Sequence, residues 1–233
     1  METRNVGPVL ELNKAIPSFE ESGLPPVPFS MRLMPGECAV VEARDASRAT
    51  IFADLCSGLV PLNDGAVKFM GLDWTELHDR EVNALRGRIG RITRRPSWTD
   101  FLGTHMGIML QQLHHTTRDV NDVVAEASRL SEQFGLPGLP VLRPAMLSDA
   151  DLLRASCVRA FMGRPHLLLL EDPLEASPAD LEDAFLSAMT TARDKGAGVI
   201  WLVRSNAVGQ RYWQGVTSRW RLADDGLVAV RMG

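Results

Sequence analysis

Two adjacent carboxylates, Glu171 and Asp172, are the side chains of this sequence best placed to do chemistry. They end the apolar run 167–170, and Pro173 follows them. A short, uniformly apolar run is typical of a central parallel strand that is covered on both faces. At the end of such a strand, carboxylates can hold a magnesium ion and a water molecule beside a phosphate. We therefore treat Glu171 and Asp172 as candidate metal and catalytic residues.

The elements after these carboxylates are predicted to form a strand, helix, strand unit. Ser177 and Pro178 indicate a helix start, with serine as the cap and proline at the first position. Gly196 is the matching stop, and 199–203 predicts a second buried strand. A right-handed unit of this kind brings three side chains to the carboxyl ends of neighbouring strands: Glu171, Asp172 and Arg204.

The rest of the chain predicts a sheet-based core interrupted by helices. Alternating apolar residues before residue 36 suggest short antiparallel strands, and 39–41 suggests a buried strand followed by a helix that ends before Pro61. From residue 96 histidine, methionine and glutamine become common, which indicates a helical insertion. The next helix should start at Ser148 and run to about residue 162. We divide the single domain into two parts. Residues 1–95 and 155–233 form the core with its β subdomain, and residues 96–154 form the helical subdomain.

Composition disfavours several classes of protein. The chain of 233 residues is 45% hydrophobic and 23% charged, which are globular averages. No apolar run approaches the length of about 20 residues that spans a bilayer. Three widely spaced cysteines argue against a disulfide framework or a zinc ribbon, and the N-terminus lacks the apolar core of a secretory signal. We therefore expect a soluble, cytoplasmic protein.

Charge and histidine content are less informative. A net charge of −4 gives no general attraction to a polyanion, so nucleic acid is not an expected partner. His105, His114 and His115 lie in the expected helical insertion, but no carboxylate or cysteine stands at ligand spacing, which disfavours a metal site there. The alternative is a local basic patch, because five arginines lie close together in the sequence: Arg86, Arg88, Arg91, Arg94 and Arg95.

Four consecutive stretches give the sequence its strongest resemblance to a known family. They are LSDAD, LLRASCVRAF, MGRPH and LLLLEDP, which together occupy residues 147–173. In order and spacing they resemble the signature, arginine-bearing helix, turn and acidic strand end of ATP-binding cassette (ABC) transporter nucleotide-binding domains. The resemblance extends from Val9 to about Ala207. It implies an α/β fold with a P-loop NTPase-like core, a mostly parallel sheet, an N-terminal antiparallel β subdomain and a helical insertion.

The resemblance places the family's phosphate loop, G-x-x-G-x-G-K-S-T, at residues 42–50. Here the glycines become two acids and a serine, the lysine becomes Arg48, the magnesium-binding serine becomes Ala49, and only Thr50 keeps its type. Glycines would let backbone N–H groups surround a phosphate, whereas carboxylates repel it. Arg48 keeps a positive charge, but its planar, forked group cannot copy a lysine threaded through a tight loop. Arg48 and Thr50 remain candidate nucleotide contacts, and a plain strand-to-helix turn is the alternative.

Other motif positions of the family are also replaced. The metal-sensing glutamine corresponds to Arg94 and the switch histidine to Arg204, and neither arginine can accept a hydrogen bond. The aspartate of the family's D-loop corresponds to Pro178. Phe19 matches the aromatic residue that stacks on adenine, with a core or edge-strand phenylalanine as the alternative.

The resemblance also implies roles for the two carboxylates, whose order is inverted relative to the family. Glu171 is long enough to reach a magnesium ion, whereas Asp172 as the general base is one methylene short of the attacking water. Because a base must come within about 2.6–3.2 Å of the oxygen whose proton it takes, hydrolysis should be severely slowed. The alternative is that both acids cap helices or pair with arginines.

The signature serine is preserved as Ser148, at a helix N-terminus where it could meet a phosphate held by a second subunit. Asp149 and Ala150 replace the signature glycines, and a carboxylate there would repel a phosphate. Because ABC sites are composite, these changes would compromise a competent partner too. Trp98 and Phe101 lie where the family docks a membrane subunit, with burial against the helical insertion as an equal alternative.

The leading hypothesis is a degenerate ATP-binding subunit of an ABC-type membrane transport complex, non-hydrolytic or regulatory, in which binding of ATP and Mg²⁺ is weak or absent. Its expected partners are a membrane permease subunit and another ABC ATPase, as a homodimer or heterodimer, at the inner face of the membrane. One alternative is a slow but genuine ATPase, with Arg48 on phosphate and Glu171 on magnesium, that energises a transporter of lipid or other cargo. A third is a soluble interaction module unrelated to transport.

Overall fold

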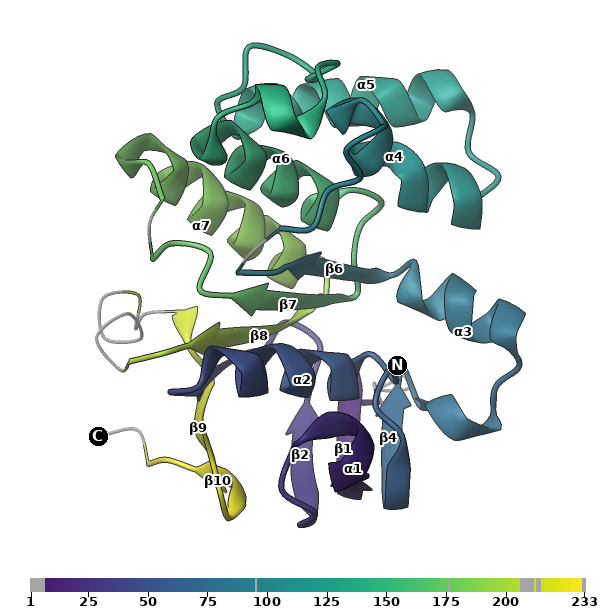
Figure 1. Cartoon of the computed structure of the whole chain (residues 1–233), viewed down its shortest axis with the longest axis vertical. Helices are drawn as coiled ribbons and strands as arrows, with labels where there is room; N and C mark the ends of the chain where they lie inside the picture. The colour runs from purple at the N-terminus through teal and green to yellow at the C-terminus, as the bar shows by residue number, and fades with distance from the viewer. Residues whose placement is uncertain (1–6, 95, 176, 206–211, 213–214, 232–233) are drawn as a thin grey trace, which may run out of the picture.

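Six strands form the sheet that carries the candidate carboxylates (Figure 1). The computed structural model describes residues 7–94, 96–175, 177–205, 212 and 215–231. In spatial order the strands are β10 (Gly226–Ala229), β9 (Ser218–Ala223), β3 (Cys38–Glu42), β8 (Gly198–Val203), β7 (Leu167–Glu171) and β6 (Ile89–Ile92). Every neighbouring pair is parallel except β9 and β10, which form an antiparallel hairpin.

The central strands of this sheet are buried on both faces. All five residues of β7 and all six of β8 are buried, as the apolar runs 167–170 and 199–203 predict. The register pairs Glu171 with Leu202, which brings the acidic end of β7 beside the end of β8. The predicted central strand and its neighbour are therefore confirmed.

A second sheet, antiparallel and four-stranded, comes mostly from the N-terminal part of the chain. Its spatial order is β2 (Phe29–Leu33), β1 (Leu10–Pro17), β4 (Leu62–Phe69) and β5 (Leu72–Asp73). The short helix α1 (Phe19–Ser22) joins β1 to β2. Buried and exposed residues alternate along β2, because one face of this sheet packs on the core and the other faces solvent.

Helices cover both faces of the six-stranded sheet (Figure 1). On one face α2 (Ala46–Cys56) packs against β1, β4 and β7, so that this helix and the two sheets share one apolar core. A second core on the other face contains residues of the remaining long helices. These helices are α4 (Thr104–His115), α5 (Val120–Gln133), α6 (Asp149–Phe161) and α7 (Ala179–Asp194).

Short elements complete the chain. The 3-10 helix η1 (Trp74–Glu76) and helix α3 (Asp79–Arg86) lead into β6, and η2 (Pro144–Met146) precedes α6. Helix α6 runs without interruption across residue 154, where the sequence suggested a boundary of the helical subdomain. Within the described residues, no helix combines the length and the apolar composition needed to cross a bilayer.

Helix boundaries show where the sequence misleads. Ser148 caps α6 through the backbone N–H of Asp151, as predicted. The predicted start of α7 is wrong by one residue, because the helix begins at Ala179 with Pro178 at the cap position. The hydroxyl of Ser177 instead donates back to the carbonyl of Leu174 at 3.4 Å, and no side chain forms a cap hydrogen bond with the helix.

Candidate functional site

The loop at the position of the expected phosphate site is short, and one of its own side chains caps the helix that follows. Only residues 43–45 join β3 to α2. The Oδ1 atom of Asp45 accepts a hydrogen bond of 2.8 Å from the backbone N–H of Ser47. A helix N-terminus carries partial positive charge and unpaired N–H groups that attract anions. The protein supplies that anion itself, with the carboxylate of Asp45.

Replacing Asp45 by alanine is therefore expected to lower the free energy of unfolding by about 1 kcal/mol, because the N–H of Ser47 loses its acceptor. Asp45→Asn keeps a side-chain oxygen and should stay within about 0.5 kcal/mol of the native protein. Urea denaturation measures both variants. Equal losses in the two would show that the charge, and not the hydrogen bond, stabilises the start of α2.

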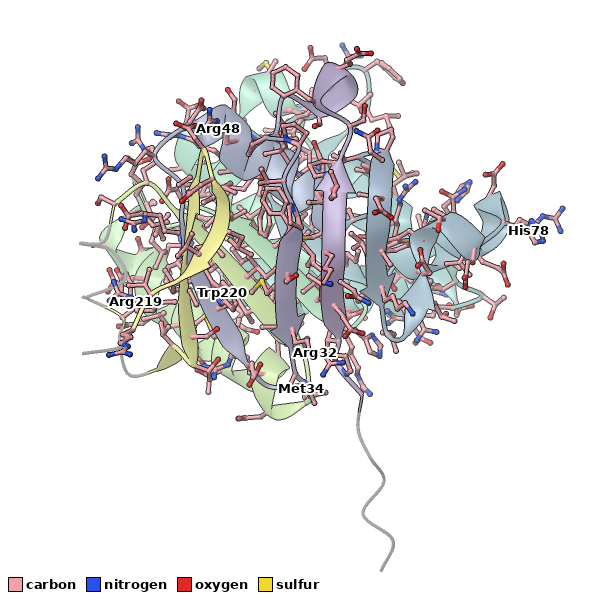
Figure 2. The ribbon with its side chains drawn as sticks, turned by 90° about the horizontal axis from the view of Figure 1, so that it is seen from below. Arg32, Met34, Arg48, His78, Arg219 and Trp220 are labelled. Atoms are coloured by element: carbon pink, nitrogen blue, oxygen red, sulfur yellow. The ribbon has the colours of Figure 1, made fainter. Side chains whose placement is uncertain are left out.

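Arg48, the candidate phosphate contact, is paired with an acid of this chain. Its guanidinium forms an ion pair with Asp224 in the turn of the β9–β10 hairpin. Figure 2 shows Arg48 beside the tip of this hairpin. Three arginines and three aspartates line a groove of about 310 Å³ here: Arg44, Arg48, Arg221, Asp45, Asp224 and Asp225. The groove thus carries both signs of charge in equal number.

Glu171 lies at the centre of a buried network and not at an open metal position. Its Oε2 atom accepts a hydrogen bond of 2.5 Å from the hydroxyl of Thr50. Its Oε1 atom accepts two from Arg91, at 3.0 Å from Nε and 2.9 Å from Nη2. Only 3% of the residue is exposed. The candidates Thr50 and Glu171 are therefore brought together, and they are bonded to each other.

The cation of this network is Arg91, which the sequence indicated only as one member of an arginine cluster. It lies on β6, and besides Glu171 it binds Asp54 of α2 and donates to the backbone carbonyl of Thr50 at 3.1 Å. Burial disfavours its charged form, but hydrogen bonds and charges from Asp54 and Glu171 outweigh burial and raise the pKa of Arg91. Arg91 thus connects β6, β7 and α2 through one guanidinium.

Asp172, the candidate base, belongs to a second charge cluster. Its backbone is in the left-handed region, with φ of 46°, and its carboxylate lies 3.7 Å from Nε of Arg204. Arg204 also pairs with Glu175, and Arg94 reaches Glu175 at 2.8 Å. The predicted convergence of Glu171, Asp172 and Arg204 at neighbouring strand ends is confirmed. Arg94 and Arg204, at the expected glutamine and histidine positions, form ion pairs with acids there.

Burial raises the pKa of the Asp172 carboxyl, opposed by the backbone N–H of Arg204 and by the charges of Arg94 and Arg204. Because the folded protein then holds this proton more tightly than the unfolded chain, the contribution of Asp172 to stability is present at low pH. It is lost as pH rises from the ordinary value of 3.8 through the raised pKa. Asp172→Asn removes this contribution to the pH dependence of stability.

We therefore expect the stability of the native protein, relative to Asp172→Asn, to fall as pH rises above about 4. Urea denaturation of both proteins across a pH series measures the difference. Asp183→Asn, on the exposed side of α7, serves as the control, because it removes a carboxylate that is open to solvent. If the native protein instead becomes more stable relative to Asp172→Asn as pH rises, the charges of Arg94 and Arg204 outweigh the effect of burial on the pKa of Asp172.

The remaining candidates lie apart from these networks. The hydroxyl of Ser148 accepts from the N–H of Asp151 at 3.1 Å and donates to its carboxylate at 2.8 Å. Phe19 is on α1 and is 56% exposed, so it is neither a core nor an edge-strand residue. Phe101 is 78% exposed, whereas Trp98 is partly buried and covered by the guanidinium of Arg159.

The arginine cluster of residues 86–94 is used mostly inside the protein. Arg86 donates to the carbonyls of Ser57 and Gly58. Arg91 and Arg94 pair with acids as described above. Arg95 falls outside the described residues. Arg86, Arg91 and Arg94 are therefore not free to form a basic patch, whereas Arg88 is exposed. No group of three potential metal ligands occurs in the described part of the chain.

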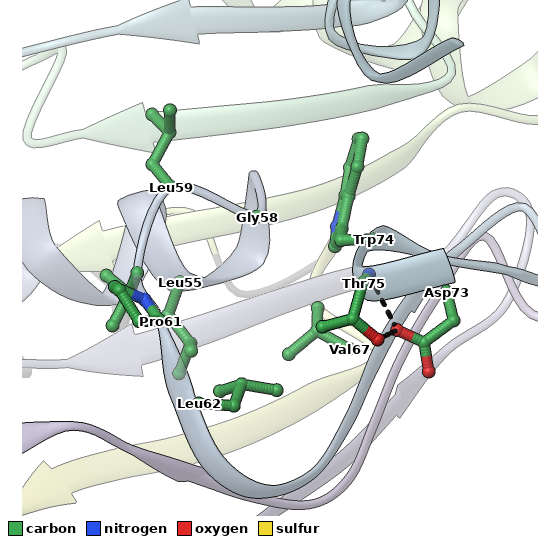
Figure 3. A pocket seen from close by; sticks show the side chains of 10 residues that line it. Leu55, Gly58, Leu59, Pro61, Leu62, Val67, Asp73, Trp74 and Thr75 are labelled. Carbon is green, nitrogen blue, oxygen red and sulfur yellow. Dashed lines mark hydrogen bonds between the residues drawn. The ribbon is translucent and has the colours of Figure 1, made fainter. Parts of the chain in front are cut away.

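A smaller hollow lies at the C-terminal end of α2. It has a volume of about 190 Å³ and is lined mainly by apolar side chains at the end of α2 and along β4 (Figure 3). Its one carboxylate, Asp73, accepts hydrogen bonds from the backbone and hydroxyl of Thr75. Gly58 is required here, because a Cβ atom would lie 2.4 Å from the ring of Trp74.

The side chains at the strand ends do not fit Mg²⁺–ATP. A phosphate loop needs free backbone N–H groups and a cation that faces the phosphate. Here Asp45 occupies one of those N–H groups, Arg48 is paired with Asp224, and position 49 is alanine. Both oxygens of Glu171 are already hydrogen-bonded to protein groups. The donors and acceptors that would hold the nucleotide and its metal are bonded to one another.

Known proteins share this architecture. A solved ATP-binding subunit of an ABC transporter matches with a TM-score of 0.78 over 95% of this chain and 90% of that one, at 19% identity. The dimeric structure of a bacterial ABC transporter cassette matches with a TM-score of 0.80 over 96% of this chain and 100% of that one, at 14% identity. The chain has the fold of an ABC transporter ATP-binding domain. The predicted fold class is thus confirmed.

Sequence comparison agrees with this ABC fold. A phosphonates import ATP-binding protein of Ruegeria sp. is 25% identical over 158 residues, which cover 65% of this chain but only 61% of that protein. A second, from Synechococcus sp., is 24% identical over 76% of this chain and 68% of its own. A bacitracin export ATP-binding protein of Halalkalibacterium halodurans is 22% identical over 79% and 73%, respectively. No protein-family model matches the chain.

Proposed function

We propose that this ABC-type chain is a non-hydrolytic, regulatory subunit of a membrane transport complex. The observation that carries the proposal is the closed network around Glu171. Its carboxylate, which would have to reach magnesium in a turning-over site, is held on both oxygens by Arg91 and Thr50. Releasing it would leave a buried charge without partners, which is costly. The network is therefore suited to holding the strands and α2 in one arrangement.

Two features support retention of a partner-binding role. Relatives in the comparisons are ATP-binding proteins of import and export systems. One fold neighbour is a dimeric ABC cassette. A membrane permease subunit and a second ABC-type chain, identical or different, are accordingly the proposed partners, at the inner face of a membrane. The exposed Phe101 is the aromatic residue proposed to contact the permease, since aromatic residues are enriched at interface cores.

The test is affinity purification of the tagged full-length chain from its native membranes, followed by an ATP hydrolysis assay of the complex. We expect a polytopic membrane protein to co-purify with the chain. Hydrolysis by the complex should be unchanged when this chain carries both Arg48→Ala and Asp172→Asn, because neither side chain contributes to turnover. A severalfold loss of hydrolysis in that double variant would favour the slow ATPase instead.

A further inference from the structure

A groove on the opposite side of the sheet from the carboxylates has the composition of a ligand site. It lies where α6 and α7 end and β7 begins, and its volume is about 530 Å³. Sites for small molecules usually occupy about 300–1,000 Å³ and combine an apolar floor with a few polar groups. We call this hollow the basic groove, after three lining side chains: Arg129, Arg164 and Lys195.

The floor of the basic groove is apolar and continuous with the core. Leu130, Phe161 and Ala188 line it, and they are 5%, 8% and 6% exposed. Phe161 packs edge-on against Phe185 with ring centroids 5.9 Å apart. The floor is therefore fixed by core packing and does not need to rearrange to receive an apolar group.

Three basic side chains line the rim of the basic groove. Among the described residues, no acid forms an ion pair with Arg129, Arg164 or Lys195. The one acid of the lining, Glu126, already pairs with Arg118 and accepts from the backbone N–H of Gly163. The lining therefore has three basic side chains and one acid, and that acid is already paired with Arg118, which lies outside the lining.

Two local features refine the kind of ligand that fits. The ends of α5, α6 and α7 place partial negative charge nearby, which attracts basic side chains and accounts for part of their position. Helix ends do not account for the open apolar floor between those side chains. His166 adds no charge near neutral pH, because burial and then the charge of Arg88 lower its pKa. A ligand must therefore offer an apolar body together with negative charge.

We propose that the basic groove binds a small anionic amphiphile, a free molecule with an apolar body and one carboxylate or phosphate group. The apolar body lies on Leu130, Phe161 and Ala188, and the anion is held by Arg164 and Lys195. Arginine suits such a group because its planar fork can donate two parallel hydrogen bonds to a carboxylate or a phosphate. The basic groove is separate from the carboxyl ends of the strands, where the candidate carboxylates lie. Its assignment does not depend on the proposed transport function.

Calorimetric titration of the full chain with octanoate and with phenyl phosphate tests the assignment. We expect at least one of the two to bind saturably, while 1-octanol and inorganic phosphate, which each lack one half of the ligand, bind at least tenfold more weakly. The double variant Arg164→Gln with Lys195→Gln should weaken binding at least tenfold, which corresponds to the loss of charge-assisted hydrogen bonds. Lys14→Gln with Arg80→Gln removes two exposed charges elsewhere and should bind like the native protein.

Three results would overturn the proposal. The first is no saturable binding of either anionic probe. The second is equal binding by the double variant or by 1-octanol. The third is flotation of the protein with phosphatidic acid vesicles, dependent on Arg164 and Lys195, without binding of the free probes, because the groove would then recognise a membrane surface and not a small molecule.

Discussion

Replacing Arg91 by leucine is expected to lower the free energy of unfolding by about 3 kcal/mol, because Glu171 then remains buried without its ionic partner. Glu171 is 3% exposed, and two of its three hydrogen bonds come from Arg91. Asp54 and the carbonyl of Thr50 lose a donor in the same change. Urea denaturation, followed by circular dichroism, measures the loss.

The network makes a second prediction that separates buried charge from lost packing. In Arg91→Leu with Glu171→Leu no buried charge is left alone, so much of the lost stability should return. The matched control is Arg94→Leu, which removes a half-exposed ion pair with Glu175 and should cost no more than about 1 kcal/mol. If Arg91→Leu is no worse than Arg94→Leu, the network does not hold the strand ends together.

Gly90→Ala is the second substitution with a large expected effect, about 2–3 kcal/mol, because it overpacks a site without free space. Gly90 lies on β6, where a Cβ atom would be 2.0 Å from the carbonyl oxygen of Ala160 and 2.8 Å from Leu168. The first of these contacts is with the backbone of α6, so no rotamer change can relieve it. The helix that carries the signature-like sequence would have to move away from the sheet.

Gly7→Ala is the control for this effect, since a Cβ atom there meets nothing within 4 Å. Its stability should stay within about 0.5 kcal/mol of the native protein. Thermal or urea denaturation of the two variants provides the comparison. A native-like Gly90→Ala would contradict the close packing of α6 on β6.

The buried strands could be predicted from sequence because a strand covered on both faces is apolar at nearly every position. Leucine at 167–170 leaves few alternatives, and β7 forms there. The start of α7 was misplaced because Ser177 and Pro178 both favour a helix N-terminus, and only tertiary context decides which of them occupies the cap position. The β9–β10 hairpin near Arg48 was not predicted, although Asp225-Gly226 is a hairpin signal that could have indicated it.

The partners of the site residues were harder to predict than the strands. Arg91 is separated from Glu171 by 80 residues, and periodicity does not indicate which cation meets which acid. The signal available was the alternative that the inverted carboxylates pair with arginines. That pairing is what the structure contains: Glu171 binds Arg91, and Asp172 lies near Arg204. Arg91 itself stood in the sequence only as one member of an arginine cluster.

Equilibrium binding of labelled ATP to the purified full chain, with and without Mg²⁺, tests the central claim most directly. The closed network around Glu171 and the pairing of Arg48 with Asp224 predict no binding that depends on magnesium. Arg48→Ala should then give the same isotherm as the native protein. Tight, magnesium-dependent binding that Arg48→Ala abolishes would contradict the account, because it would require the network to open for a nucleotide and its metal.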